Sequence, residues 1–283
     1  MTTTMTGALG RHWPEYLIEG WALGTFMVSA GVVATLLGAP ASPLSRTIPD
    51  PMARSVIGGV AMGLTAIAII HSAWGKRSGA HMNPAVTLTF LRLGKVHPWD
   101  ALFFVAAQIA GGMLGVLLVA GVLGRAFTDP PVSYAVTLPG PAGPGVAFVA
   151  EAVISCGLML MILLLSSSAR LARFTGLAAG GLVAVYISFE SPLSGMSMNP
   201  ARTLASAAPG MVWRHLWIYL TAPLLGMLAG AQLFLVLRGV RRLACAKLLH
   251  PSDARCIHCG YEPAARDSPA TASTDARSTH LYE

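Results

Sequence analysis

Long apolar runs separated by short polar connectors dominate the pattern along this chain. Six runs are long enough to cross a hydrocarbon core about 30 Å thick, which takes roughly 20 helical residues. They cover residues 15–38, 52–73, 99–123, 145–167, 174–189 and 212–238. Because hydrocarbon offers the backbone no hydrogen-bond partners, each run is predicted to be a helix. The pattern therefore predicts an all-α membrane protein.

Composition and charge support this interpretation. Of the 283 residues, 54% are hydrophobic and only 11% are charged, against about 25% charged in soluble domains. The net charge is +7, and the basic residues gather in short connectors and the tail, which is typical of cytoplasmic loops and argues against a nucleic-acid-binding protein. We expect a multi-pass protein of the plasma or inner membrane, with cytoplasmic termini at 1–14 and 244–283 and a largely disordered tail.

Two short segments repeat. Ser-Gly-Ala-His-Met-Asn-Pro-Ala begins at Ser78, and Ser-Gly-Met-Ser-Met-Asn-Pro-Ala begins at Ser194. Each follows the second helix of a three-helix set, and the first helix of each set carries a carboxylate, Glu19 or Glu151. Because each set has an odd number of spans, residues 15–123 and 145–238 would lie in opposite orientations. This is an inverted repeat, whose site lies at the interface between the repeats near the midplane.

The repeated tripeptides predict two short helices. Asn caps a helix and Pro suits its first position. The residues concerned are Asn83, Pro84, Ala85, Asn199, Pro200 and Ala201. Neither run spans alone, so two half-helices would meet N-terminus to N-terminus, where their positive dipole ends repel cations and orient a neutral dipole. The two Asn amides would offer donors to the permeant, and Glu19 and Glu151 would accept from the loop amides.

With these motifs the chain resembles the aquaporin family, also called major intrinsic proteins, over about residues 16–238. The resemblance implies an hourglass of six transmembrane helices and two re-entrant half-helices, within a channel domain at 15–243. It implies a homotetramer with one pore per subunit. It also implies passive passage of water and/or small uncharged solutes, exclusion of protons and ions, no cofactor for transport and no enzymatic activity.

The resemblance also places a selectivity filter. Arg202 follows the second motif, and counting back from Asn199 gives Met196 and Ile187. On the second helix the position is Met62 with a one-residue insertion, which we favour, or Gly63 by ungapped counting. Strict water channels usually have Phe and His at the two helix positions. The apolar wall here favours a facilitator of glycerol, urea, ammonia, peroxide or a metalloid acid with poor water flux.

Other positions point back toward water, among them Thr203 and Ala207 after the second motif, so both permeant classes stay open. By the same resemblance His81 braces the first loop and Gln108 is a buried polar brace. Alternatives are a secondary transporter, which would need coupling groups facing the cavity, and a structural membrane protein whose pore is closed.

The tail holds a separate chemical pattern. Cys256-Ile-His-Cys259-Gly resembles a zinc knuckle, in which two thiolates share one metal. Cys245 with His250, or with His258, would complete four ligands for zinc. Cys245 is alternatively a palmitoylation site next to the last helix. A metal there would make the tail a regulatory element or a tetramer clamp.

Overall fold

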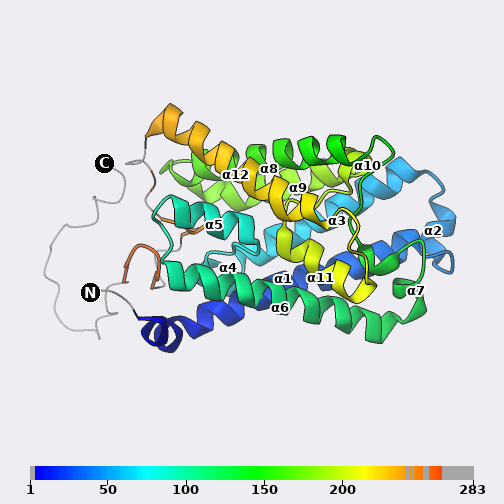
Figure 1. The fold of residues 1–283 in the computed structure, drawn as a ribbon, viewed down its shortest axis with the longest axis horizontal. Coiled ribbons are helices and arrows are strands. Elements are labelled where there is room, and N and C mark those ends of the chain that lie inside the picture. Colours follow the sequence, from blue (N-terminus) through cyan, green and yellow to red (C-terminus); the bar gives the residue numbers. More distant parts are fainter. Residues whose placement is uncertain (1–3, 240–242, 244, 251–254, 263–283) are drawn as a thin grey trace, which may run out of the picture.

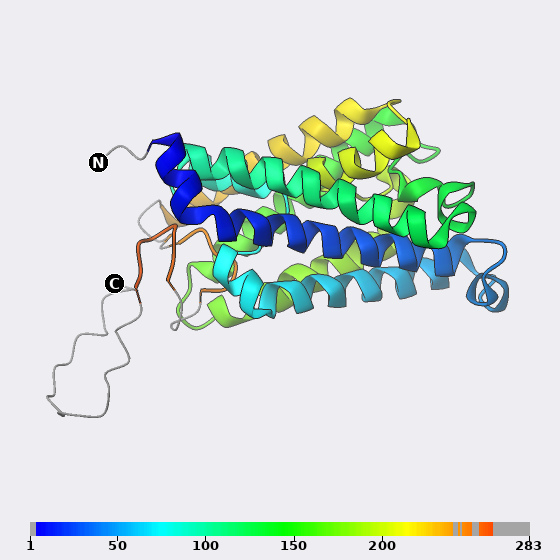
Figure 2. The ribbon, with the colours of Figure 1, turned by 90° about the horizontal axis from the view of Figure 1, so that it is seen from below.

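The computed structural model describes residues 4–239, 243, 245–250 and 255–262. Long helices lie lengthwise along the molecule, and the described part of the chain begins and ends at the same end of the bundle, here called the end with the termini (Figures 1 and 2). The long helices are α1 (Met5–Gly38), α3 (Pro51–His71), α6 (Pro98–Leu123), α8 (Pro144–Ser166), α9 (Thr175–Phe189) and α12 (Leu216–Arg238). With the turn before α9 included, all six are long and apolar enough to cross a membrane. The described part of the chain contains no strand.

Shorter elements connect the long helices. They are α2 (Pro43–Thr47), α4 (Ala73–Ser78), α5 (Pro84–Arg92), α7 (Arg125–Thr128), η1 (Ser133–Ala135), η2 (Ala172–Phe174), α10 (Ser191–Ser194) and α11 (Pro200–Gly210). The helices α5 and α11 have 9 and 11 residues, which gives lengths of about 14 and 17 Å. Each therefore reaches about halfway through a hydrocarbon core.

Two helix starts differ from the sequence prediction. Helix α1 begins at Met5 instead of residue 15, because the Thr4 hydroxyl accepts from the Gly7 amide at 3.2 Å and caps it. Helix α12 begins at Leu216 instead of residue 212, because Met211 and His215 adopt left-handed φ angles of 52° and 61°, which a continuous right-handed helix does not allow. The disorder predicted for the tail falls mainly on residues 263–283, outside the described residues.

The two halves pack by the same rules. Helix α1 packs along α6 as α8 packs along α12, and α3 packs along α9 across the junction of the halves. Each half-helix also contacts the last long helix of the other half: α11 packs on α6, and α5 packs on α12. In Figure 1, α5 lies near the end with the termini and α11 lies toward the opposite end. Exchanging the halves preserves this pattern, which confirms the inverted repeat and the hourglass fold.

Glycines allow the paired helices to touch backbone to backbone. A Cβ added at Gly111 on α6 would lie 2.0 Å from the Gly20 oxygen on α1. In the second half, a Cβ at Gly226 on α12 would lie 2.2 Å from the Ala152 oxygen on α8. Small residues at such crossings are how membrane helices gain close packing without a hydrophobic driving force.

We expect Gly111→Ala to lower stability by about 2 kcal/mol or more, because overpacking at a backbone contact forces the helices apart. The measurement is the thermal aggregation midpoint of the purified protein in detergent. Gly121→Ala on the same helix is the matched control, since a Cβ there meets nothing within 4 Å. Equal midpoints for the two variants would contradict the proposed close crossing.

Candidate functional site

The two half-helices begin as the Asn-Pro-Ala motifs predict. The side-chain oxygen of Asn83 accepts from the Ala85 amide at 2.9 Å and caps α5. The side-chain oxygen of Asn199 accepts from the amides of Ala201 and Arg202, at 3.1 and 3.2 Å, and caps α11. Each capped helix start turns its unpaired amides and its positive dipole end toward the middle of the bundle.

The same two side chains tie the halves together. The Asn83 Nδ2 donates to the Met198 carbonyl at 2.7 Å, and the Asn199 Nδ2 donates to the Met82 carbonyl at 2.7 Å. Each amide thus bonds the residue that precedes the other asparagine. A side-chain amide has two N–H donors, so one hydrogen of each stays available at the cavity that both residues line.

Both loops before the half-helices have an irregular backbone. Ala80 and Met82 in the first loop have φ of 53° and 52°, and Met196 and Met198 in the second have φ of 50° and 53°. Such values are uncommon for residues other than glycine. A backbone with these φ angles cannot form helical hydrogen bonds, so the amides of the two loops need acceptors from elsewhere in the protein.

Two buried carboxylates supply these acceptors. Glu19 accepts from the Ser78 hydroxyl at 2.7 Å and from the amides of His81 and Met82 at 3.0 and 2.7 Å. In the second half, Glu151 accepts from the Ser194 hydroxyl at 2.8 Å and from the amides of residues 197 and 198, both at 2.7 Å. The matching bonds place the two loops in equivalent conformations.

Gln108 and His81 occupy the bracing positions around the first loop. The Gln108 Nε2 donates to Glu19 at 2.8 Å and to the Thr87 hydroxyl at 3.2 Å. His81 is buried, with Nδ1 3.1 Å from the Thr87 hydroxyl and Nε2 2.9 Å from the Ala246 carbonyl. Because a carbonyl only accepts, Nε2 carries the proton. His81 therefore connects the loop to the C-terminal tail.

A cavity of about 560 Å³ runs along the interface of the halves and contains both asparagines in its wall. The filter positions Met62, Ile187, Met196 and Arg202 also line it. Gly63 instead faces α9, where an added Cβ would lie 2.5 Å from the Gly180 oxygen. Of the two second-helix candidates, Met62 is therefore the residue that contacts the cavity.

Arg202 brings a cationic group to this otherwise largely apolar wall. Its Nη1 is enclosed and has no hydrogen-bond partner within the described part of the chain. Buried donors are rarely left unpaired in folded proteins. An oxygen of a molecule in the cavity is the kind of acceptor that this guanidinium lacks.

Four tail side chains come together as a group that could hold a metal ion. The ligand atoms of Cys245, His250, Cys256 and Cys259 all lie within 4.8 Å of one another. The sulfurs of Cys245 and Cys256 are 3.4 Å apart, and the His250 Nε2 lies 3.3 Å from the Cys259 sulfur.

His258, the alternative ligand, lies outside this group. Its Nε2 is 2.9 Å from the Ser78 carbonyl, and its ring stacks on His81 with the centroids 5.6 Å apart. Burial lowers the pKa of His258 to about 4. Because the Ser78 carbonyl only accepts, the Nε2 of the neutral ring carries the proton and donates it.

Sequence reasoning missed four contributing residues. Ser78 and Ser194 bind the buried carboxylates, and their place in the repeated motif was a usable signal. Tyr219 donates to the Ser194 carbonyl at 2.6 Å. Leu248 lines the cavity from the tail, and no local pattern distinguishes it from the leucine that follows it.

Comparison with known proteins is consistent with this arrangement. The model of the family described as "Major intrinsic protein" matches residues 13–234. Aquaporin NIP6-1 of Arabidopsis thaliana is 34% identical over 188 residues, which is 66% of this chain and 59% of that protein. Aquaporin NIP2-3 of Zea mays is 38% identical over 191 residues, which is 66% of this chain and 60% of that protein. The matches thus span about 60% of the length of these relatives.

Among solved structures, the aquaglyceroporin from Plasmodium falciparum superposes with a TM-score of 0.63 at 21% identity, covering 79% of this chain and 95% of that chain. This likeness confirms the hourglass fold. The family match, the six apolar helices and the paired Asn-Pro-Ala half-helices agree. The chain is a multi-pass membrane protein and belongs to the major intrinsic protein family.

Proposed function

We propose that this protein is a passive transmembrane channel for small uncharged molecules. The observation that carries the proposal is the reciprocal bonding of Asn83 and Asn199 at the wall of a continuous cavity. Two positive helix ends at one point raise the energy of any cation, including hydronium. A neutral molecule meets amide donors there instead, so it crosses while ions are excluded.

The proposed selectivity filter is the group formed by Met62, Ile187, Met196 and Arg202. Three apolar side chains and one guanidinium favour a solute with an apolar surface and an oxygen acceptor, because water gains few hydrogen bonds from such a wall. We therefore propose passage of glycerol, urea or an undissociated metalloid acid, with water as a second permeant. The name of the solved relative, an aquaglyceroporin, supports this choice of solutes.

We propose that both termini are cytoplasmic and that the channel forms a homotetramer in the plasma or inner membrane. Basic residues near the start of α1, from α4 to α6, between α8 and α9 and at the end of α12 support this orientation; they include Arg11, Lys76, Arg77, Arg92, Lys95, Arg170, Arg173 and Arg238. Exposed apolar side chains on the outer helix faces, such as Leu118 and Val153, suit lipid or neighbouring subunits.

The double variant Met62→Phe/Ile187→His tests the filter. We expect glycerol uptake to fall about tenfold, the effect of about 1.4 kcal/mol of added barrier, while water flux persists, because the larger ring narrows the passage and imidazole adds polar partners. Stopped-flow light scattering on proteoliposomes under water and glycerol gradients measures both fluxes. Leu64→Phe on the outer face of α3, where Leu64 is 60% exposed, is the control. Glycerol uptake equal to that of the unaltered protein would refute the assignment.

We also propose that the four-residue group in the tail binds one zinc ion. A tetrahedral zinc with bonds of about 2.3 Å to sulfur holds two sulfurs about 3.8 Å apart, close to the 3.4 Å between Cys245 and Cys256. Backbone amides of Lys247, Cys259 and Tyr261 bond the sulfurs of Cys245, Cys256 and Cys259, respectively. Such bonds stabilise thiolates and orient them toward a metal.

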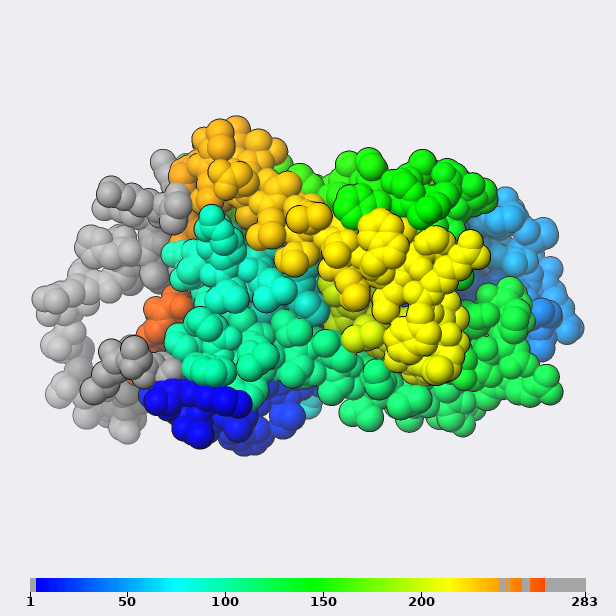
Figure 3. All heavy atoms as spheres, viewed as in Figure 1, coloured from blue at the N-terminus to red at the C-terminus, as the bar shows by residue number. Residues whose placement is uncertain are grey.

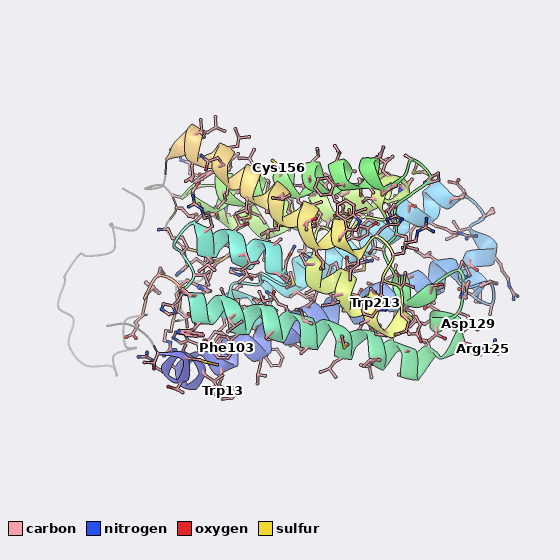
Figure 4. The ribbon with its side chains drawn as sticks, in the orientation of Figure 1. Trp13, Phe103, Arg125, Asp129, Cys156 and Trp213 are labelled. Atoms are coloured by element: carbon pink, nitrogen blue, oxygen red, sulfur yellow. The ribbon has the colours of Figure 1, made fainter. Side chains whose placement is uncertain are left out.

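Metal analysis of the purified protein tests this proposal. We expect about one zinc per chain, as for a Cys₃His site, and loss of that zinc in Cys256→Ser and Cys259→Ser because each removes a thiolate ligand. Cys156→Ser is the matched control, since Cys156 lies on α8 well away from the tail (Figure 4). Full zinc retention by both ligand variants would rule the site out.

A further inference from the structure

The C-terminal tail is built into the end of the channel wall. The Leu248 amide donates to the Gly79 carbonyl at 3.2 Å, and His258 donates to the Ser78 carbonyl at 2.9 Å. In return the tail carbonyl of Ala246 accepts from His81 at 2.9 Å. Figure 3 shows the segment 255–262, in orange-red, at this end of the molecule. The tail thus uses loop carbonyls that would otherwise be free to accept from a molecule in the pore.

Leu248 lines the cavity at this end. Its side chain is 4% exposed, lines the cavity, and belongs to the same apolar cluster as Ile70, Ala80 and Ile162, each 1% exposed. At the opposite end the lining includes the exposed Pro51 and the half-buried Arg54. The cavity lining thus includes exposed and half-buried residues at the start of α3 and buried apolar side chains at the end with the termini. A hydrophobic constriction is one way in which a channel stops water.

The metal group holds the same segment. Leu248 lies between Cys245 and His250 in the sequence, and Cys256 and Cys259 supply the other two ligand atoms of the group. A segment this short buries too little apolar surface to fold alone, so a bound metal supplies much of its folding free energy. Without the metal, the segment between Cys245 and His250 would lose the constraint that seats Leu248 in the cavity.

We propose that zinc bound by Cys245, His250, Cys256 and Cys259 holds Leu248 in the mouth of the pore as a plug, so that removing zinc opens the channel. This inference rests on the proposed channel function. The ligand is a thiophilic divalent cation, and the regulated step is the displacement of the tail from the first re-entrant loop. Ser78 and Gly79 would then be free to accept hydrogen bonds from a permeant.

Leu248→Ala is the sharpest test because it removes the plug and keeps the four ligands. If Leu248 blocks the pore in most channel molecules, only a small fraction of them conducts, and permeability rises in proportion to the fraction that is open. We expect water and glycerol permeability in proteoliposomes to rise about tenfold with the zinc content unchanged. Leu249→Ala is the matched control, because Leu249 is the next residue but is absent from the cavity lining. Equal permeability of Leu248→Ala and the unaltered protein would overturn the plug.

Zinc removal tests the coupling on the unaltered chain. A membrane-permeant zinc chelator should raise permeability to the level of Leu248→Ala, and added zinc should restore the low value. Cys256→Ser should lose zinc and stay open, whereas Cys156→Ser should behave as the unaltered protein. Permeability that does not respond while zinc is stripped would overturn the proposal. If every variant, including Leu248→Ala and zinc-free Cys256→Ser, showed flux no higher than empty vesicles, the channel function itself would be overturned.

Discussion

The hydrogen bonds made by two buried carboxylates are the constraint on which the rest of this structure depends. Glu19 and Glu151 are fully buried on the first helix of each half, where a charged group is costly unless it is well bonded. Each accepts a serine hydroxyl and two backbone amides of a re-entrant loop. Without these acceptors the left-handed stretches before the half-helices would leave amides unpaired inside the membrane.

The braced loops determine where the half-helices meet. Because each loop ends at an asparagine that caps the half-helix, the two positive helix ends face one another, and the crossed amide bonds fix their separation. Close crossings between α1 and α6 and between α8 and α12 hold the scaffold in place. The cavity is therefore lined by side chains that project from rigid elements. In the proposed channel, selectivity then depends on a few side chains at the wall and not on the scaffold.

The tail adds a cluster of cysteine and histidine side chains that the two-fold repeat does not contain. Hydrogen bonds between the described residues join the tail to the first of the two re-entrant loops, through Ser78, Gly79 and His81. The half-helices and their braces are equivalent, but this contact makes the two ends of the cavity different. In the proposed channel, the tail could therefore control flux from one end without disturbing the symmetric centre, where the proposed ion exclusion depends on both half-helices.

The sequence by itself determined the six spans, the inverted repeat, the two asparagine caps and the bracing carboxylates. Hydrophobic length, helix-start chemistry and repeated spacing are local signals, so they can be read without a structure. Only the tertiary structure decided that Met62 and not Gly63 meets the cavity, and that Leu248 lies in it. These outcomes depend on which face of a helix meets which neighbour and on contacts such as His81 with Ala246, 165 residues apart. Such contacts leave no period or motif in the chain, because they arise only when distant segments pack together.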